Sequence, residues 1–165
     1  MGLVRVSKEL MKIHKDIYLT ADMFLVNKIP FFLTLLRRIV FTAVHHLSNR
    51  TVPQIFNAFK EIFTYYLQRG FRITTIGMDG DFAPLKPLIA AMPGGPHVNL
   101  TSAKEHVPDI ERRIRLVKER SRATRHRLLF QRILQLMVTH MVLFVVKMLN
   151  YFPPKGEFQH TSVLK

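Results

Sequence analysis

Residues 17–44 read IYLTADMFLVNKIPFFLTLLRRIVFTAV, and the first half of the expected sheet lies within this stretch. The segments 17–26, 29–38 and 39–44 are rich in aromatic, β-branched and other apolar residues, a composition typical of buried strands. Asn27-Lys28 separates the first two segments as a hairpin turn would. Because the connections are too short for crossover helices, the pattern predicts three antiparallel strands.

Helices and strands alternate through the rest of the chain. Apolar residues recur at three- and four-residue steps in the helical segments, and Pro93-Gly94-Gly95-Pro96 marks a loop. The expected elements are a helix at 52–68, a strand at 71–78, a short helix at about 82–92, a short strand at 97–102, and helices from about 109 and at 133–152. This order predicts an α/β fold, a mixed five-stranded sheet flanked by helices, with the first strand in its interior.

The charge balance points to a polyanionic partner. The 165 residues, enough for one domain, include 25 Lys and Arg but only 11 Asp and Glu, so the net charge is +14 and the pI about 10.7. Such an excess favours binding to nucleic acid or to an anionic membrane. The absence of cysteine excludes disulfides, a cysteine nucleophile and zinc sites that need thiolates.

Residues 133–152 are apolar and long enough to span a bilayer. Gln135, His140, Lys147 and Asn150 interrupt them, however, and a charged or polar group is costly in hydrocarbon. The sequence therefore predicts a buried core helix and no membrane partner. Because no apolar run follows the basic N-terminus, secretion is not expected either.

Three acidic residues occupy positions that suit catalysis. Asp22 lies in the middle of a strand, Asp79 at the end of another, and Glu111 in the first turn of a basic helix. If they converge, their mutual repulsion calls for a cation, and oxygen ligands suit Mg²⁺ or Mn²⁺. Two such ions form the clamp used in phosphoryl transfer. Taken singly, each acid also has an ordinary explanation: a solvent-facing strand residue, a turn residue and a partner of the helix dipole.

Other acids compete for these positions. Asp81 lies two residues further into the turn than Asp79, and Glu105 precedes the helix. Glu119 follows Glu111 by two helical turns, about 12 Å along the axis at 1.5 Å per residue, which is too far to share its metal ions.

Three short motifs resemble one known family. They are TADMF around Asp22, MDGDF around Asp79, and HVPDIERRIRLVKER around Glu111. Together they resemble the acidic triad of retroviral and retrotransposon integrase catalytic cores, and most of all those of copia-type elements. The resemblance implies a ribonuclease H-like fold, with Asp22, Asp79 and Glu111 as catalytic and metal-binding residues. The sequence departs from the family in having only 31 residues between Asp79 and Glu111 and in reducing the motif before the glutamate to Pro108-Asp109-Ile110.

The resemblance also implies an activity and partners. The expected reaction is metal-dependent 3′-end processing of element DNA and its strand transfer into target DNA, with two Mg²⁺ or Mn²⁺ ions as cofactors. A homo-oligomer is expected, and the nucleus is the expected location for a eukaryotic element. The expected divisions are an N-terminal extension at 1–16, the catalytic core at 17–152 and a truncated tail at 153–165. Neither a zinc-binding domain nor a C-terminal DNA-binding domain is recognisable in the sequence, so the alternative is a catalytically inactive, nucleic-acid-binding remnant.

The helix that carries Glu111 is strongly basic. Residues 111–127 contain eight Arg or Lys residues against two Glu. The residues assigned to DNA are Arg112, Arg115, Lys118 and Arg122. Phosphate contacts would give affinity without sequence readout, although many such faces are merely solvated. A related nuclease acting on RNA–DNA hybrids is a further possibility.

Overall fold

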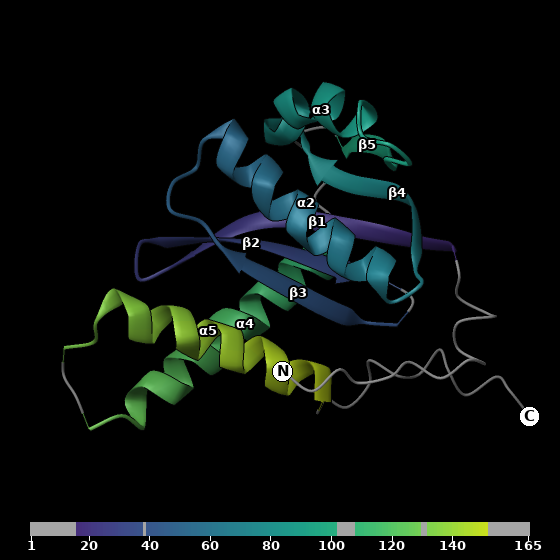
Figure 1. The fold of residues 1–165 in the computed structure, drawn as a ribbon. Coiled ribbons are helices and arrows are strands. Elements are labelled where there is room, and N and C mark those ends of the chain that lie inside the picture. Colours follow the sequence, from purple (N-terminus) through teal and green to yellow (C-terminus); the bar gives the residue numbers. More distant parts are fainter. Residues whose placement is uncertain (1–15, 38, 102–107, 130–131, 152–165) are drawn as a thin grey trace, which may run out of the picture.

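The computed structural model describes residues 16–37, 39–101, 108–129 and 132–151. Its centre is a five-stranded sheet in the order β3-β2-β1-β4-β5 (Figure 1). The strands are β1 (Asp16–Val26), β2 (Ile29–Leu36), β3 (Phe41–His46), β4 (Arg72–Asp79) and β5 (His97–Thr101). The expected boundaries at 16 and 153 fall at the edges of the described residues or outside them.

The sheet is mixed, as the sequence predicts. β1, β2 and β3 pair antiparallel, whereas β4 is parallel to β1 and β5 is parallel to β4. The turn between β1 and β2 consists of Asn27 (φ 51°) and Lys28 (φ 65°), the left-handed conformation that a two-residue hairpin turn requires. β1 therefore occupies the middle of the sheet, which confirms the expected position of the strand that carries Asp22.

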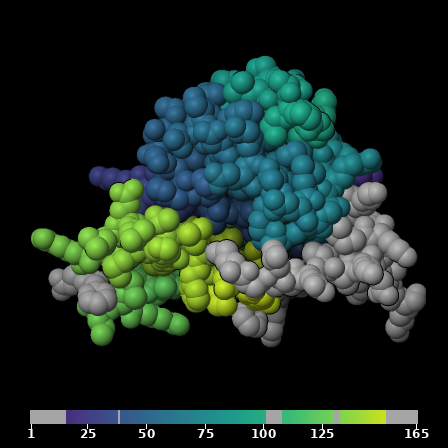
Figure 2. Space-filling model, viewed as in Figure 1, coloured from purple at the N-terminus to yellow at the C-terminus, as the bar shows by residue number. Residues whose placement is uncertain are grey.

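Helices cover both faces of the sheet. One face packs against α2 (Val52–Gln68), the 3₁₀ segment η1 (Gly80–Leu85) and α3 (Lys86–Ala90). The other face packs against α4 (Pro108–His126) and α5 (Gln135–Tyr151). In Figure 2 the residues of α4 and α5, in green to yellow, form a layer beneath the blue and teal part of the molecule. Two apolar cores result, one on each side of the sheet.

This two-sided burial explains why β2 is apolar at every position except Thr34. Phe31 and Leu33 belong to the core beneath α4 and α5, whereas Phe32 and Leu36 belong to the core beneath α2. All four side chains are fully buried. Successive side chains of a strand point to opposite faces, so a strand covered on both sides is apolar along most of its length. The buried Thr34 is accommodated by its hydrogen bond with the Tyr66 hydroxyl (3.0 Å).

The expectation of a single helix at 82–92 is wrong. The structure has a 3₁₀ segment, η1, followed directly by the short α3. Pro84 lies inside η1 and Pro87 in the first turn of α3. A proline lacks the N–H that an inner turn of an α-helix needs, so a continuous helix cannot form here.

α5 is a core helix, as predicted. Its buried side chains lie on the face toward the sheet. The Asn150 side chain accepts a hydrogen bond from the N–H of Thr42 (2.9 Å) and donates one to the C=O of Thr42 (2.8 Å), on the edge strand β3. His140 and Lys147 are exposed. Within the described part of the chain, no helix has the length and apolarity needed to cross a bilayer.

Candidate active site

Asp22 and Asp79 lie side by side on the two central strands. The parallel pairing of β1 and β4 runs up to Ala21 opposite Met78, so the next residues on the two strands are Asp22 and Asp79. Each aspartate accepts a 2.6 Å hydrogen bond at Oδ1 from the N–H of the residue that follows it, Met23 and Gly80 respectively. These local bonds orient both carboxylates at the end of β4.

Glu111 reaches the same region from α4, which packs across β1. Asp22 and Glu111 line one open cavity of about 380 Å³. The cavity is also lined by Arg115, Lys118 and, further along the helix, Arg122. Carboxylates and cations thus share one surface.

The electrostatics of Asp22 show that the three acids are close. The pKa of Asp22 is raised from 3.8 to about 6, first by burial and then by the negative charges of Asp79 and Glu111. The hydrogen bond from Met23 and the positive charge of Lys118 act in the opposite direction. The structure therefore brings the expected trio together closely enough for each charge to act on Asp22.

The competing acids have different surroundings. Asp81 is exposed in η1, and Glu105 lies outside the described residues. Glu119 lines the same cavity as Glu111, but it is not among the charges that raise the pKa of Asp22. Glu111 is therefore the helical acid that is electrostatically coupled to the strand pair.

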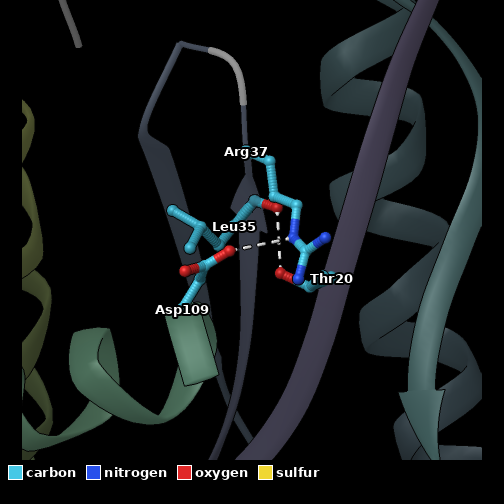
Figure 3. A network of polar contacts seen from close by, with 4 residues as sticks. All are labelled: Thr20, Leu35, Arg37 and Asp109. Carbon is cyan, nitrogen blue, oxygen red and sulfur yellow. Dashed lines mark hydrogen bonds and ion pairs between the residues drawn. The ribbon is translucent and has the colours of Figure 1, made fainter. Parts of the chain in front are cut away.

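An ion pair links the first turn of α4 to the end of β2. Asp109 pairs with Arg37, which follows β2, at 3.1 Å (Figure 3). Figure 3 also shows the adjoining bond from the Thr20 hydroxyl to the carbonyl of Leu35, which ties β1 to β2 at the same place. Glu111 lies two residues beyond Asp109, in the same turn of the helix.

Arg113 is a buried residue that binds α4 to the β2–β3 turn and to β3. Its side chain is only 2% exposed. It donates from Nε to the Thr42 hydroxyl and from a terminal guanidinium nitrogen to the carbonyl of Val40, both at 2.7 Å. Val40 has φ 52°, a strained conformation for a β-branched residue, and its carbonyl thereby faces the guanidinium. α4 is thus bound to the turn between β2 and β3.

Sequence reasoning missed Arg113 because it treated the basic run as one exposed surface. The spacing of apolar residues could have revealed it, because Arg113 lies three residues after Ile110 and four before Val117, both buried positions of the same helix face.

The residues assigned to DNA lie mostly at the surface. Arg112, Arg115 and Arg122 are exposed, and Lys118 is half-buried. Three of these residues line the cavity of Asp22 and Glu111, and Arg112 does not.

The donor set suits a hard divalent cation, since it consists of carboxylate oxygens. A cation would also relieve the repulsion that raises the pKa of Asp22. Among the described residues, however, no three His, Asp or Glu side chains are grouped closely enough to hold a metal ion as they stand. The three carboxylates therefore have the ligand atoms and the charge of a metal site, but they do not converge closely enough to coordinate one ion.

Comparison with known proteins supports the fold. No protein-family model and no curated protein matches the chain. Among solved structures, it superposes on the crystal structure of the catalytic core domain of BIV integrase with a TM-score of 0.60 and 12% identity, over 83% of this chain and 85% of that one. The fold is that of a retroviral integrase catalytic core. This integrase-like, ribonuclease H-like α/β fold confirms the expected fold class.

Proposed function

We propose that this integrase-like domain is a metal-dependent polynucleotidyl transferase from a copia-type retrotransposon. Its reactions would be 3′-end processing of element DNA and strand transfer of that end into target DNA. The observation that carries the proposal is the coupling of Asp22 to Asp79 and Glu111 beside a basic helix, within an integrase-core fold. A carboxylate whose pKa is raised by burial and by neighbouring acids is typical of functional sites, and a cation would relieve the repulsion.

Asp22, Asp79 and Glu111 would hold the divalent ions, Mg²⁺ or Mn²⁺. When bound, two such ions activate the attacking oxygen and stabilise the leaving one. The chain's own contribution is orientation: the N–H groups of Met23 and Gly80 fix one oxygen of each aspartate. Arg113 and the pairing of Asp109 hold the start of α4, and with it Glu111, against the sheet.

The basic face of α4 would bind DNA phosphates next to the acids. Arg115, Lys118 and Arg122 line the cavity that contains Glu111, and Arg112 extends the charge outward. Such contacts give affinity that depends on salt and little on sequence. Element ends and target DNA are the proposed partners, in a homo-oligomer, with the nucleus as the location in a eukaryotic host.

One observation favours a second candidate, a catalytically inactive nucleic-acid-binding remnant of such a domain. The three carboxylates are not gathered into a metal-binding group among the described residues. A remnant would keep the basic face of α4 and lose only the ability to assemble the ions. The two candidates therefore differ in metal dependence and agree in DNA binding.

The deciding experiment compares Glu111→Gln with Glu119→Gln. Both variants remove one negative charge from the same helix and the same cavity, so general electrostatics predicts equal effects. Metal coordination predicts that Glu111→Gln alone abolishes Mn²⁺-dependent nicking or strand transfer of an element-end duplex, with DNA affinity unchanged or slightly raised. Equal loss in both variants, or in neither, would refute the role of Glu111. Absence of activity in the unaltered chain, with DNA binding kept, would favour the remnant.

A further inference from the structure

Thr42 is the residue where helices α4 and α5 both contact the edge of the sheet. It lies on β3, the outermost strand on that side, and is 1% exposed. Alternate N–H and C=O groups of an edge strand have no neighbouring strand to pair with. For Thr42 the side-chain amide of Asn150, on α5, takes that place: it accepts from the N–H (2.9 Å) and donates to the C=O (2.8 Å). Two hydrogen bonds thus fix Thr42 to α5.

The third polar group of Thr42, its hydroxyl, is bonded from α4. It accepts a 2.7 Å hydrogen bond from Nε of Arg113, and a terminal nitrogen of the same guanidinium donates to the carbonyl of Val40. All the polar groups of Thr42 are therefore engaged by side chains from two helices. Because a guanidinium is planar and rigid, two bonds to neighbouring acceptors fix its direction as well as its distance. A displacement of Thr42 would therefore move Arg113.

The direction of Arg113 is linked to that of Glu111. The two residues are two positions apart in α4, so their side chains leave the helix about 200° apart at 3.6 residues per turn. Arg113 is buried against β3, whereas Glu111 lines the open cavity together with Asp22. A rotation of α4 about its axis would break the bonds of Arg113 and turn the Glu111 carboxylate relative to Asp22. The bonds of Arg113 therefore set the rotation at which Glu111 faces the cavity.

We propose that Asn150 and Thr42 are positioning residues for the metal ligand Glu111. Asn150 fixes Thr42, Thr42 fixes the guanidinium of Arg113, and the guanidinium fixes the rotation of α4. Neither Asn150 nor Thr42 lines the cavity of Asp22 and Glu111, so both act through Arg113. Partners outside the ligand shell commonly orient metal ligands in this way. The inference rests on the proposed metal-dependent function and makes the site depend on α5 as well as on α4.

Two threonine variants test this role. Thr42→Val keeps the shape of the side chain and the backbone bonds to Asn150 but removes the acceptor of Arg113 Nε. Thr34→Val is the matched control, because the Thr34 hydroxyl bonds that of Tyr66 (3.0 Å) in the core on the opposite face of the sheet. Both are buried threonines on strands, and each variant loses one side-chain hydrogen bond. A purely structural role predicts lower stability in both variants and the same orientation of α4.

The first readout is the position of α4 in the metal-free protein. The chain contains no cysteine, so spin labels can be attached to cysteines introduced at Ala83, exposed in η1, and at Ala123, exposed on α4. Double electron–electron resonance then measures the distance between the two labels. We expect Thr42→Val and Asn150→Leu to shift or broaden the distance distribution and Thr34→Val to leave it unchanged. An unchanged distribution in the first two variants would overturn the inference.

The second readout is the affinity for Mn²⁺, measured by electron paramagnetic resonance of the free ion at a temperature where every variant is folded. Thr42→Val and Asn150→Leu should weaken it about tenfold, the lower end of the effect of partners outside the ligand shell. Thr42→Ser keeps the hydroxyl and should keep the affinity of the unaltered chain. An equal loss in Thr34→Val would overturn the inference, because the loss would then follow from stability alone. Should Asn150→Leu fail to fold, Asn150→Asp takes its place, since it keeps the size and the acceptor for the Thr42 N–H.

The outcomes separate this inference from the proposed function. If the unaltered chain binds no Mn²⁺ but the distance distributions change as expected, the metal-dependent function fails and the coupling of α5 to α4 through Thr42 stands. If the unaltered chain binds Mn²⁺ and Thr42→Val and Asn150→Leu bind it equally well, the positioning role is overturned and the proposed function stands. If neither Mn²⁺ binding nor a change in distance is observed, both fail.

Discussion

Replacing Asp22 by Asn should stabilise the free protein at neutral pH. The Asp22 carboxylate is largely buried and lies beside two other acids, and for these reasons its pKa is raised from 3.8 to about 6. Asn has nearly the same shape and carries no charge. Its side-chain oxygen can still accept the hydrogen bond from the N–H of Met23. The variant therefore isolates the cost of the buried negative charge.

The sign and size of the effect follow from this pKa. The folded protein keeps the Asp22 proton up to about pH 6, while the unfolded chain releases it near pH 3.8. The contribution of Asp22 to stability therefore falls as pH rises between these values and stays low above them. The difference corresponds to about 3 kcal/mol. Asp22→Asn should be more stable than the unaltered chain by about this amount at pH 7.5, and equal to it near pH 3.5.

Urea denaturation of both proteins across this pH range measures the difference in the free energy of unfolding. In thermal unfolding at pH 7.5 the variant should melt about 6–12 °C higher, given roughly 2–4 °C per kcal/mol for a chain of this size. Asp81→Asn is the control, because Asp81 is an exposed acid near the same strand end and should change stability by less than about 0.5 kcal/mol. Added Mn²⁺ should stabilise the unaltered chain and not Asp22→Asn, since binding to the folded state alone raises its stability.

Two results would refute this reasoning. A variant that is less stable at pH 7.5 would show that Asp22 is held by contacts worth more than its charge costs. A stability gain that does not depend on pH would show that the charge is not its source. In either case the raised pKa of Asp22, from burial first and then from Asp79 and Glu111, would be wrong.

Three further predictions concern other parts of the molecule. DNA affinity should fall steeply between low and physiological salt, and Arg115→Ala or Lys118→Ala should weaken it similarly on unrelated sequences; a flat salt response in anisotropy would exclude phosphate binding. Arg113→Met should lower the free energy of unfolding by about 3 kcal/mol, because the buried Thr42 hydroxyl and the partly buried Val40 carbonyl lose their donor; a change below about 1 kcal/mol in urea denaturation would contradict this. Gly77→Ala should lower Tm by several degrees, since the new methyl group would overlap the Tyr18 hydroxyl, and Tyr18→Phe in the same protein should restore part of the loss in calorimetry.

Local chemistry made much of the fold predictable from the sequence. The hairpin at Asn27-Lys28 and the helix at 52–68 lie where turn residues and apolar spacing placed them. The buried face of α4 at Ile110, Ile114 and Val117 likewise follows its periodicity. These features depend on residues a few positions apart, whose interactions hardly change between one fold and another.

Only part of the candidate site could be predicted from the sequence. The acids could be recognised by type and by resemblance, but their meeting depends on β1 pairing with β4, which follows β1 only after two strands and a helix. Asp22 and Asp79 adjoin because that pairing is parallel and its register stops one residue earlier, at Ala21 and Met78. No local pattern sets this register.

The sequence by itself therefore determined the strands, the long helices, the excess of positive charge and the acids available for chemistry. Only the tertiary structure decided that Arg113 is buried against the β2–β3 turn while its neighbour Arg112 is exposed, and that Arg113 and Asn150, from two helices, meet at Thr42. The physical reason is that burial and electrostatic coupling depend on neighbours brought together from distant parts of the chain. The sequence gives the charge and polarity of each side chain, but the free energy of burying that side chain and its pKa depend on those neighbours.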